Sequence, residues 1–333
     1  MGNRLTSLEI CAGAGGQAIG LEAAGFDHLA LVEVDHHACN TLRFNRPSWN
    51  VIEMDVRKFD GKPYEGVDFF AGGVPCPPFS VAGKQLGWDD ERDLFPDALR
   101  LVEETRPKAV MIENVKGLMS KKFANYRKQI LRKLKELGYF GDWKLIYAAD
   151  FGVPQLRPRA ILVALQEAYW PYFDWPCVKP GERLTVGEAL YDQMAANGWE
   201  GAEAWSGKAN SIAPTLVGGS KKHGGADLGP TRAKKAWLEL GVNGKSLANE
   251  APMPDFEGIP RLTVQMTATV QGFPKDWVFT GKKTASYRQI GNAFPPPVAK
   301  GVGRAIASAL RKEKLFDKPG IVLELAFSET TKR

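Results

Sequence analysis

The sequence of 333 residues contains few cysteines, few histidines and no long apolar run. Its four cysteines lie far apart and form no Cys-x-x-Cys pair, which argues against a disulfide framework and a zinc knuckle. His36, His37 and Cys39 lie close together but lack a second ligand pair at zinc-site spacing, so we expect no metal. No apolar stretch approaches the roughly 18 residues of a membrane span, and no signal-peptide core is present. We therefore expect a cytoplasmic protein in a reducing compartment, with no membrane partner.

Positive charge is unevenly distributed along the chain. The formal net charge is +6, and residues 205–245 alone contribute seven Lys or Arg against two acidic side chains, a local excess of +5. Phosphate binding requires clustered positive charge, although a basic, Gly-rich segment can also be a solvated loop region. The charge distribution is therefore compatible with nucleic-acid binding without establishing it.

The first half of the chain alternates short apolar runs with amphipathic segments, which is typical of an α/β fold with a parallel sheet. After about residue 176 glycine, proline and tryptophan become frequent and the periodicity fades, which indicates a second, smaller domain. Near residue 295 a helical pattern returns. We predict strands within 7–10, 28–33, 50–54, 67–70, 107–114, 143–150 and 159–165. We predict one domain from residues 1–178 and 284–333, and another from 179–283.

A Gly-rich segment, CAGAGG, follows the first predicted strand. Gly13, Gly15 and Gly16 open a helix, where free N–H groups and close backbone approach favour ligand binding. Glu33 ends the next strand about 20 residues later, as expected of an acid that bonds ribose hydroxyls, and Asp55 follows the third strand. The three strand ends together indicate a site for an adenosine-like ligand.

The stretch GGVPCPPFS carries one cysteine between prolines. Pro75, Pro77 and Pro78 fix φ and remove backbone donors, so Cys76 is expected on a stiff, non-helical loop. Such a rigid support suits a nucleophile. A buried structural thiol on a Pro-rich turn is the alternative interpretation.

In chain order, the motifs CAGAGG, VEVD, MDV, GGVPCPPFS, RDLF, IENV, QLRPR, QGFP and RQIGNAFPPPVA resemble those of the DNA cytosine-5 methyltransferase family, in its prokaryotic or phage modification form. The resemblance covers nearly the whole chain except residues 180–255. It implies a Rossmann-like, S-adenosylmethionine-dependent methyltransferase domain with a smaller target-recognition domain. The methyl donor would be S-adenosyl-L-methionine, and the substrate a specific double-stranded DNA site.

The chemistry of cytosine C5 methylation needs a thiolate that adds to C6, an acid at N3 and a cation near O2. Cys76 is the expected thiolate, and Glu113 of IENV the expected acid. Arg157 and Arg159 of QLRPR are expected at i and i+2 on one extended strand face, with Arg159 at O2 as the resemblance implies. The alternatives are a strand-end carboxylate in a salt bridge and an exposed strand edge.

The resemblance also implies the binding residues. The predicted cofactor-binding residues are Cys11, Ala12, Gly13, Gly15, Gly16, Glu33, Val34, Asp55, Val56, Pro75 and Asn292. The predicted DNA-binding residues are Ser80, Thr215, Lys221, Lys222, His223, Arg232, Lys234 and Lys235.

Two other functions remain open at this point. A transfer-RNA cytosine methyltransferase shares the motif series, but its usual Cys-Phe-Thr element is absent here. A catalytically inactive DNA-binding relative is disfavoured by the presence of Cys76, Glu113 and Arg159. We expect a monomer acting on DNA in the nucleoid, with a cognate restriction endonuclease that acts independently. The recognised bases cannot be deduced, because readout depends on which side chains reach the groove edges.

Overall fold

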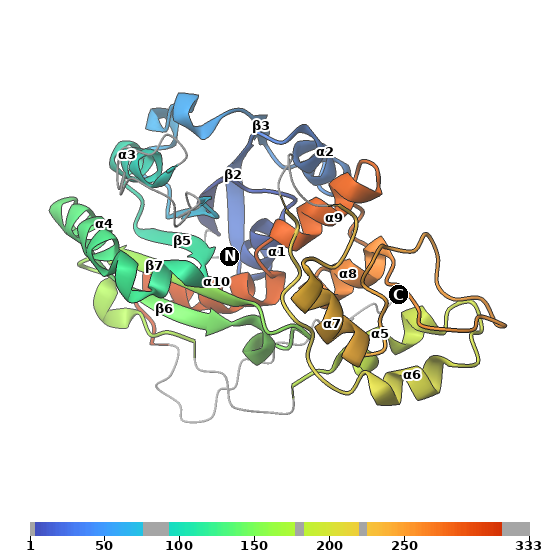
Figure 1. The fold of residues 1–333 in the computed structure, drawn as a ribbon. Helices are drawn as coiled ribbons and strands as arrows, with labels where there is room; N and C mark the ends of the chain where they lie inside the picture. The colour runs from blue at the N-terminus through green and yellow to red at the C-terminus, as the bar shows by residue number, and fades with distance from the viewer. Residues whose placement is uncertain (1–3, 76–92, 177–182, 220–224, 315–333) are drawn as a thin grey trace.

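The computed structural model describes residues 4–75, 93–176, 183–219 and 225–314. Seven strands form one sheet in the order β3-β2-β1-β4-β5-β7-β6 (Figure 1). Each strand overlaps one of the seven predicted segments. The strands are β1 (Leu5–Ile10), β2 (Phe26–Glu33), β3 (Val51–Glu53), β4 (Phe69–Gly72), β5 (Ala109–Val115), β6 (Tyr139–Tyr147) and β7 (Pro158–Gln166).

Successive strands are added first on one side of β1 and then on the other, so the strand order reverses between β1 and β4. From β1 the chain adds β2 and β3 on one side, then crosses to place β4 and β5 on the other. These five strands pair in parallel, so their carboxyl ends meet at one edge, where doubly wound folds bind ligands.

The sheet is not parallel throughout, because β7 runs antiparallel to both β5 and β6. The link between β6 and β7 is a single 3₁₀ turn, η6 (Ala148–Phe151), and a short loop. A parallel pairing would need a crossover of a dozen or more residues.

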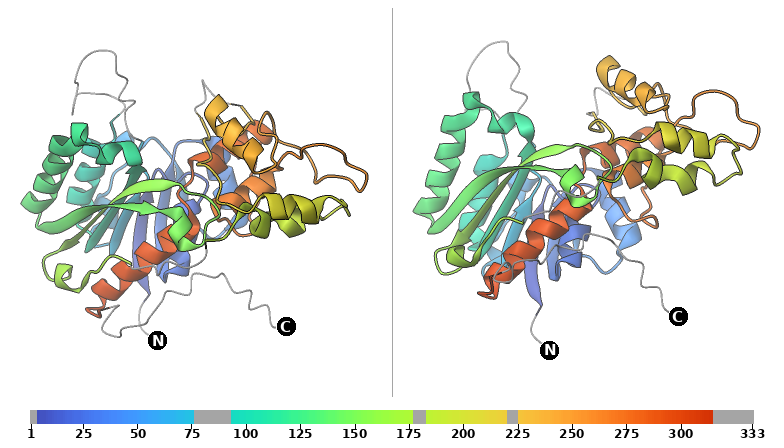
Figure 2. Two further views of the ribbon diagram at one scale, coloured as in Figure 1. Left: turned by 60° about the horizontal axis from the view of Figure 1, so that its bottom comes forward. Right: turned by 90° about the horizontal axis from the view of Figure 1, so that it is seen from below.

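Helices cover both faces of the sheet (Figures 1 and 2). Leu8 and Ile10 of β1 face one way and pack with the apolar sides of α3 and α4, while α1 and α10 pack together against the opposite face. Their bounds are α1 (Gly16–Ala23), α2 (His36–Asn45), α3 (Phe95–Thr105), α4 (Ala124–Glu136) and α10 (Pro296–Leu310).

The segment after residue 183 forms short helices where the sequence showed little periodicity. These helices gather on one side of the sheet (Figure 1). Local capping explains some of them, since Thr185 accepts from the Glu188 N–H and Glu188 bonds back to Thr185. The helices are α5 (Val186–Met194), α6 (Ala202–Lys208), α7 (Thr231–Glu239), α8 (Val264–Gln271) and α9 (Lys283–Asn292).

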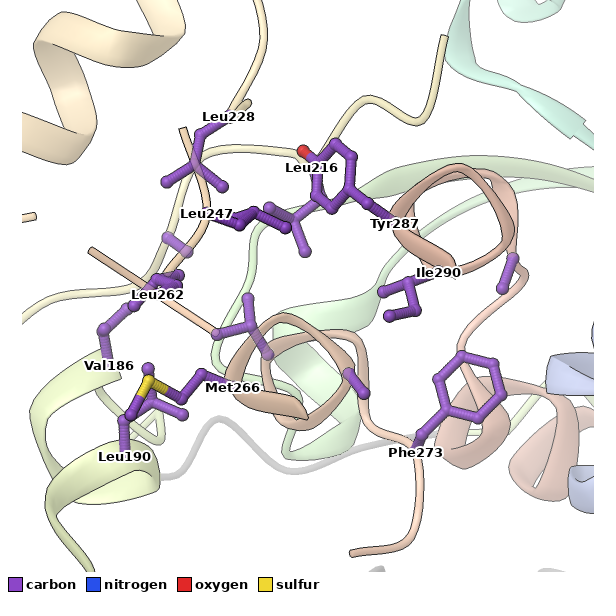
Figure 3. Packing of buried hydrophobic residues seen from close by; sticks show 14 of the residues in the cluster. Val186, Leu190, Leu216, Leu228, Leu247, Leu262, Met266, Phe273, Tyr287 and Ile290 are labelled. Carbon is purple, nitrogen blue, oxygen red and sulfur yellow. The ribbon is translucent and has the colours of Figure 1, made fainter. Parts of the chain in front are cut away.

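One hydrophobic cluster joins this segment to the sheet layer. Figure 3 shows Leu190 of α5, Met266 of α8 and Ile290 of α9 in it. Leu42 of α2 belongs to the same cluster. The division at residues 178 and 283 stays a prediction, but the two parts share buried packing.

Two absences hold for the described ranges. No helix there is long and apolar enough to cross a membrane. Among the same residues no group of three or more His, Cys, Asp or Glu side chains could hold a metal ion.

Candidate active site

A cavity of about 570 Å³ lies at the carboxyl ends of the parallel strands. Its walls come from the β1–α1 loop, the end of β2, the segment after β3, the loop after β4, and the end of α9. The predicted cofactor-binding residues that line it are Cys11, Ala12, Gly13, Glu33, Val34, Asp55, Val56, Pro75 and Asn292.

Glu33 organises the loop beside this cavity. Its Oε2 accepts from the Gly13 N–H at 2.7 Å, and its Oε1 accepts from the N–H groups of Val34 and Asp35 at 2.8 and 2.7 Å. Burial raises the pKa of Glu33, while these three donors lower it. Glu33 is therefore a structural part of the β1–α1 loop as well as a candidate ligand contact.

Gly15 and Gly16 are not among the cavity-lining residues. A Cβ on Gly16 would lie 2.2 Å from the Phe294 carbonyl oxygen, and one on Gly15, where φ is +92°, would lie 2.8 Å from a Leu42 methyl carbon. These glycines permit close packing of α1 against the chain before α10 and against α2. Of the three predicted glycines, only Gly13 faces the cavity.

Two buried polar residues in the cavity wall were missed in the sequence. Glu9 on β1 and Gln17 on α1 are almost fully buried, and their side-chain oxygen and nitrogen atoms have no hydrogen-bond partner within the described residues. Burial raises the pKa of Glu9 well above its usual value, and the Glu33 carboxylate adds to this rise. Alternation along β1 gives no signal for Glu9, because Leu8 and Ile10 face the opposite side of the sheet and a polar residue between them is typical of a solvent-facing position.

Asp55 begins a 3₁₀ turn, η1 (Val56–Lys58), at the edge of the cavity. It accepts hydrogen bonds from the Arg57 backbone at 3.0 Å and from the Arg57 guanidinium. These bonds lower the pKa of Asp55 to about 2. The Asp55 carboxylate therefore remains charged at neutral pH.

Glu113 and Arg159 form an ion pair at the same edge of the sheet. Arg159 on β7 lies opposite Val115 on β5, two residues beyond Glu113 and thus on the same face. The Arg159 Nε lies 2.6 Å from Glu113 Oε1, and both side chains are about 12% exposed. Burial raises the pKa of Glu113, and the positive charge of Arg159 opposes this shift. Glu113 also lines the cavity, so the ion pair borders it.

Asn114, the third residue of the IENV motif, holds the loop that leads to the predicted nucleophile. Its side-chain N–H donates to the Val74 carbonyl at 3.0 Å, and its Oδ1 accepts from the Val115 N–H. Cys76 follows Val74 by two residues and lies outside the described residues. Sequence reasoning assigned no role to Asn114.

The prediction that Arg157 and Arg159 share one extended strand face is wrong. Arg157 precedes β7, has a φ of +26° and is fully buried. Its guanidinium donates to main-chain carbonyls of Leu216, Gly291 and Ala293. Buried carbonyls without donors would be costly, so Arg157 serves these main-chain groups, while Glu113 pairs with Arg159.

The predicted DNA-binding residues are only partly described. Thr215 lies in the loop before Gly218, and Arg232 and Lys235 are exposed on α7. Lys234 forms an ion pair with Asp227 at 3.1 Å. Four of the predicted residues lie outside the described residues, namely Ser80, Lys221, Lys222 and His223.

A doubly wound sheet with a cavity at its switch point, beside a buried carboxyl–guanidinium pair, is typical of an α/β enzyme that binds a ligand at the carboxyl ends of its strands. The chain matches the family of C-5 cytosine-specific DNA methylases over residues 5–308. It belongs to that family and is a DNA cytosine-5 methyltransferase of the prokaryotic modification type.

Similar proteins agree with this assignment. The chain is 58% identical over 313 residues to the Type II methyltransferase M.NgoMIV of Neisseria gonorrhoeae, covering 93% of this chain and 99% of the relative. It is 56% identical to M.NaeI of Lentzea aerocolonigenes, covering 93% and 76%. The Entamoeba histolytica methyltransferase EhMeth, at 14% identity and a TM-score of 0.64, shares the fold over 93% of this chain and 99% of its own.

Proposed function

We propose that the chain methylates C5 of a cytosine turned out of a specific double-stranded DNA site, through a covalent bond between Cys76 and C6. The observation that carries the proposal is the buried Glu113–Arg159 pair beside the cavity. A target base stacked in the duplex does not expose the faces of C5 and C6, so it must leave the stack before attack.

The chain's own groups fit the steps of this reaction. The Cys76 thiolate adds to C6 of the ring, and Glu113 supplies a proton or hydrogen bond at N3 while Arg159 stabilises charge at O2. The resulting enamine makes C5 nucleophilic. After methylation, C5 releases its proton to solvent water, N3 returns any proton it received to Glu113, and the C6–S bond breaks, which returns the thiolate and the methylated base.

The family depends on S-adenosylmethionine, and the cavity fits that group. The Glu33 carboxylate and Asp55 line the cavity and supply acceptors for ribose hydroxyls and an adenine amino group. Backbone at Gly13 has no side chain to obstruct the ligand. When bound, the cofactor supplies an electrophilic methyl group; the residues proposed to hold it are those of the cavity wall, with Asn292 from the end of α9.

Trapping of a covalent adduct tests the proposal. A duplex with 5-fluorocytosine at the target should give a denaturation-resistant adduct with the wild-type protein and cofactor, because fluorine at C5 prevents the final elimination. Cys76→Ala should give none and should still bind DNA. Absence of the wild-type adduct would contradict the covalent route, and methyl transfer to transfer RNA instead of DNA would contradict the substrate.

The proposal extends to the oligomeric state, the cellular location and the partner enzyme of the protein. We propose a monomer that acts in the cytoplasm of a prokaryotic cell, where the chromosome lies, and that protects sites cut by an independent restriction endonuclease. Bisulfite sequencing of DNA from cells that express the protein would identify the methylated site.

A further inference from the structure

Arg157 lies where the chain before β7 meets two distant segments. Its Nη1 donates to the Leu216 carbonyl at 2.9 Å, and its Nη2 donates to the carbonyls of Gly291 and Ala293 at 2.8 and 2.7 Å. The side chain has no exposed surface. One guanidinium therefore joins the loop after Ala213 to the end of α9.

Two buried glutamines extend this junction. Gln155 Oε1 accepts from the Leu216 N–H at 2.7 Å, and Gln155 Nε2 donates to Gln271 Oε1 at 2.8 Å. Gln271 Nε2 donates to the same Ala293 carbonyl that Arg157 bonds. We call Gln155, Arg157 and Gln271 the Arg157 cluster. Gln155 bonds Gln271 directly, and Arg157 and Gln271 both donate to the Ala293 carbonyl.

The two segments also touch each other directly. A Cβ on Gly291 would lie 2.4 Å from the Gly218 nitrogen, and Asn292 Nδ2 donates to the Gly219 carbonyl at 3.2 Å. The segment 215–219 carries Thr215, a predicted DNA-binding residue, and its last residue Gly219 lines the cavity together with Asn292 and Ala293. DNA-side and cofactor-side elements are thus in contact, with Arg157 holding both.

We propose that Arg157 is a positioning residue that couples cofactor binding to DNA binding, by fixing the segment 215–219 against the segment 291–293. This inference rests on the proposed function, because it takes the two segments as the DNA and cofactor sides. Occupation of the cavity holds residues 291–293 in place. Because the buried guanidinium bonds both segments, fixing residues 291–293 also fixes the Leu216 main chain and the start of β7, the strand that carries Arg159.

Lysine cannot take over this role. A guanidinium presents a planar fork of five N–H donors, whereas an ammonium is a compact group on a flexible stem. An ammonium at this position could bond the Leu216 carbonyl or the Gly291 and Ala293 carbonyls, but it could not hold both sides in one fixed geometry. Arg157→Lys should therefore keep a buried charge yet lose the coupling.

The test measures DNA affinity with and without S-adenosylhomocysteine, using a duplex that carries the identified site. In the wild type the cofactor product should tighten DNA binding by about tenfold, within the usual range for coupled sites. In Arg157→Lys this factor should fall to less than about twofold, a change that a uniformly less stable protein would not show. Arg127→Lys is the matched control, because Arg127 also donates to two main-chain carbonyls, those of Leu118 and Ser120, away from both segments.

A milder variant covers the case in which Arg157→Lys does not fold. Gln155→Met removes the bonds of Gln155 to the Leu216 N–H, the Gln271 side chain, the Val270 carbonyl and the Arg157 guanidinium, but it leaves the Arg157 bonds to the three carbonyls. It should reduce the coupling factor partly. A wild type without coupling, or foldable variants that keep the wild-type factor, would overturn the proposal. Failure of the proposed function would show separately, as a missing wild-type adduct with 5-fluorocytosine DNA.

Discussion

Replacing Glu33 by glutamine should destabilise the protein even when no cofactor is present. The carboxylate accepts three backbone N–H groups at 2.7–2.8 Å, two at Oε1 and one at Oε2. Glutamine keeps one oxygen for Val34 and Asp35 but turns an NH₂ toward the Gly13 N–H. One buried donor then loses its acceptor, which costs about 1–3 kcal/mol.

Glu33→Ala should cost more. It removes the acceptor of all three donors, and about 1 kcal/mol for each gives about 3 kcal/mol. Urea denaturation of the cofactor-free protein is the assay; at a slope near 3 kcal/mol/M, a loss of about 2 kcal/mol moves the midpoint by about 0.7 M. Calorimetry should also give weaker cofactor binding by about 1–3 kcal/mol, with DNA affinity in the absence of cofactor nearly unchanged.

Glu53→Gln is the matched control for the glutamine exchange. Glu53 ends the neighbouring strand β3, but it pairs with Arg43 and His36 on the surface, where such pairs contribute about 0–1 kcal/mol. If Glu33→Gln leaves the urea midpoint of the cofactor-free protein at the wild-type value while cofactor binding weakens, Glu33 acts on the ligand alone. The loop-organising role assigned from the three short bonds would then be wrong.

Three further outcomes are expected. Glu113→Gln should lower kcat by about 10²–10⁴. Because the protonated acid is the active form, activity of the wild type should fall as pH rises through the raised pKa of Glu113, and the variant should not show this fall. An unchanged pH–rate profile would exclude Glu113 as the acid. Gly16→Ala should lower unfolding free energy by about 1–3 kcal/mol in urea, because its Cβ meets the Phe294 carbonyl, whereas the control Gly117→Ala meets nothing within 4 Å; equal midpoints would contradict this. Lys235→Gln should lower the salt slope of DNA binding by about 1, and Lys234→Gln by less, because Lys234 already pairs with Asp227; the reverse order would contradict that difference.

The sequence predicts the sheet well because its strands are short apolar runs at regular intervals. It fails at β7, whose direction depends on the length of the link from β6 rather than on any residue pattern. It also fails for α5 to α8, since short helices owe their stability more to caps and tertiary packing than to periodicity. Met266 illustrates this: it is the N3 residue of a capped helix and a member of the shared core.

Some residues of the candidate site could likewise be predicted from the sequence, and others could not. Glu33 and Asp55 could be predicted because they end or follow strands that reach one sheet edge. Gly15 and Gly16 were assigned to the ligand, yet they serve packing, because a Gly-rich loop has the same sequence whether a ligand or a neighbouring carbonyl approaches it. The sequence misplaces Arg157, because two arginines separated by one residue suggest alternation along a strand. The positive φ of Arg157, just before β7, instead directs its side chain toward residues more than 50 positions away in the chain.

The arrangement of residues 213–219 determines how target recognition can be exchanged between relatives. The Leu156 N–H donates to the Ala213 carbonyl, and the Ala213 N–H donates to the Pro154 carbonyl. Leu216 bonds Gln155 and Arg157, so the segment is tied by hydrogen bonds to the chain before β7. Exposed Arg232 and Lys235 lie beyond it on α7.

Replacing residues 220–260 by the equivalent segment of a relative with a different target should therefore transfer that target while keeping residues 213–219 and the chemistry of Cys76. The reason is a division of roles, since phosphate contacts position a duplex and base-edge contacts specify its sequence. Bisulfite sequencing of DNA from expressing cells gives the methylated site. Gly218→Ala in the same chimera is the control and should abolish activity, because its Cβ would lie 2.5 Å from the Arg288 carbonyl oxygen. An active chimera that still methylates the original site would place recognition outside residues 220–260.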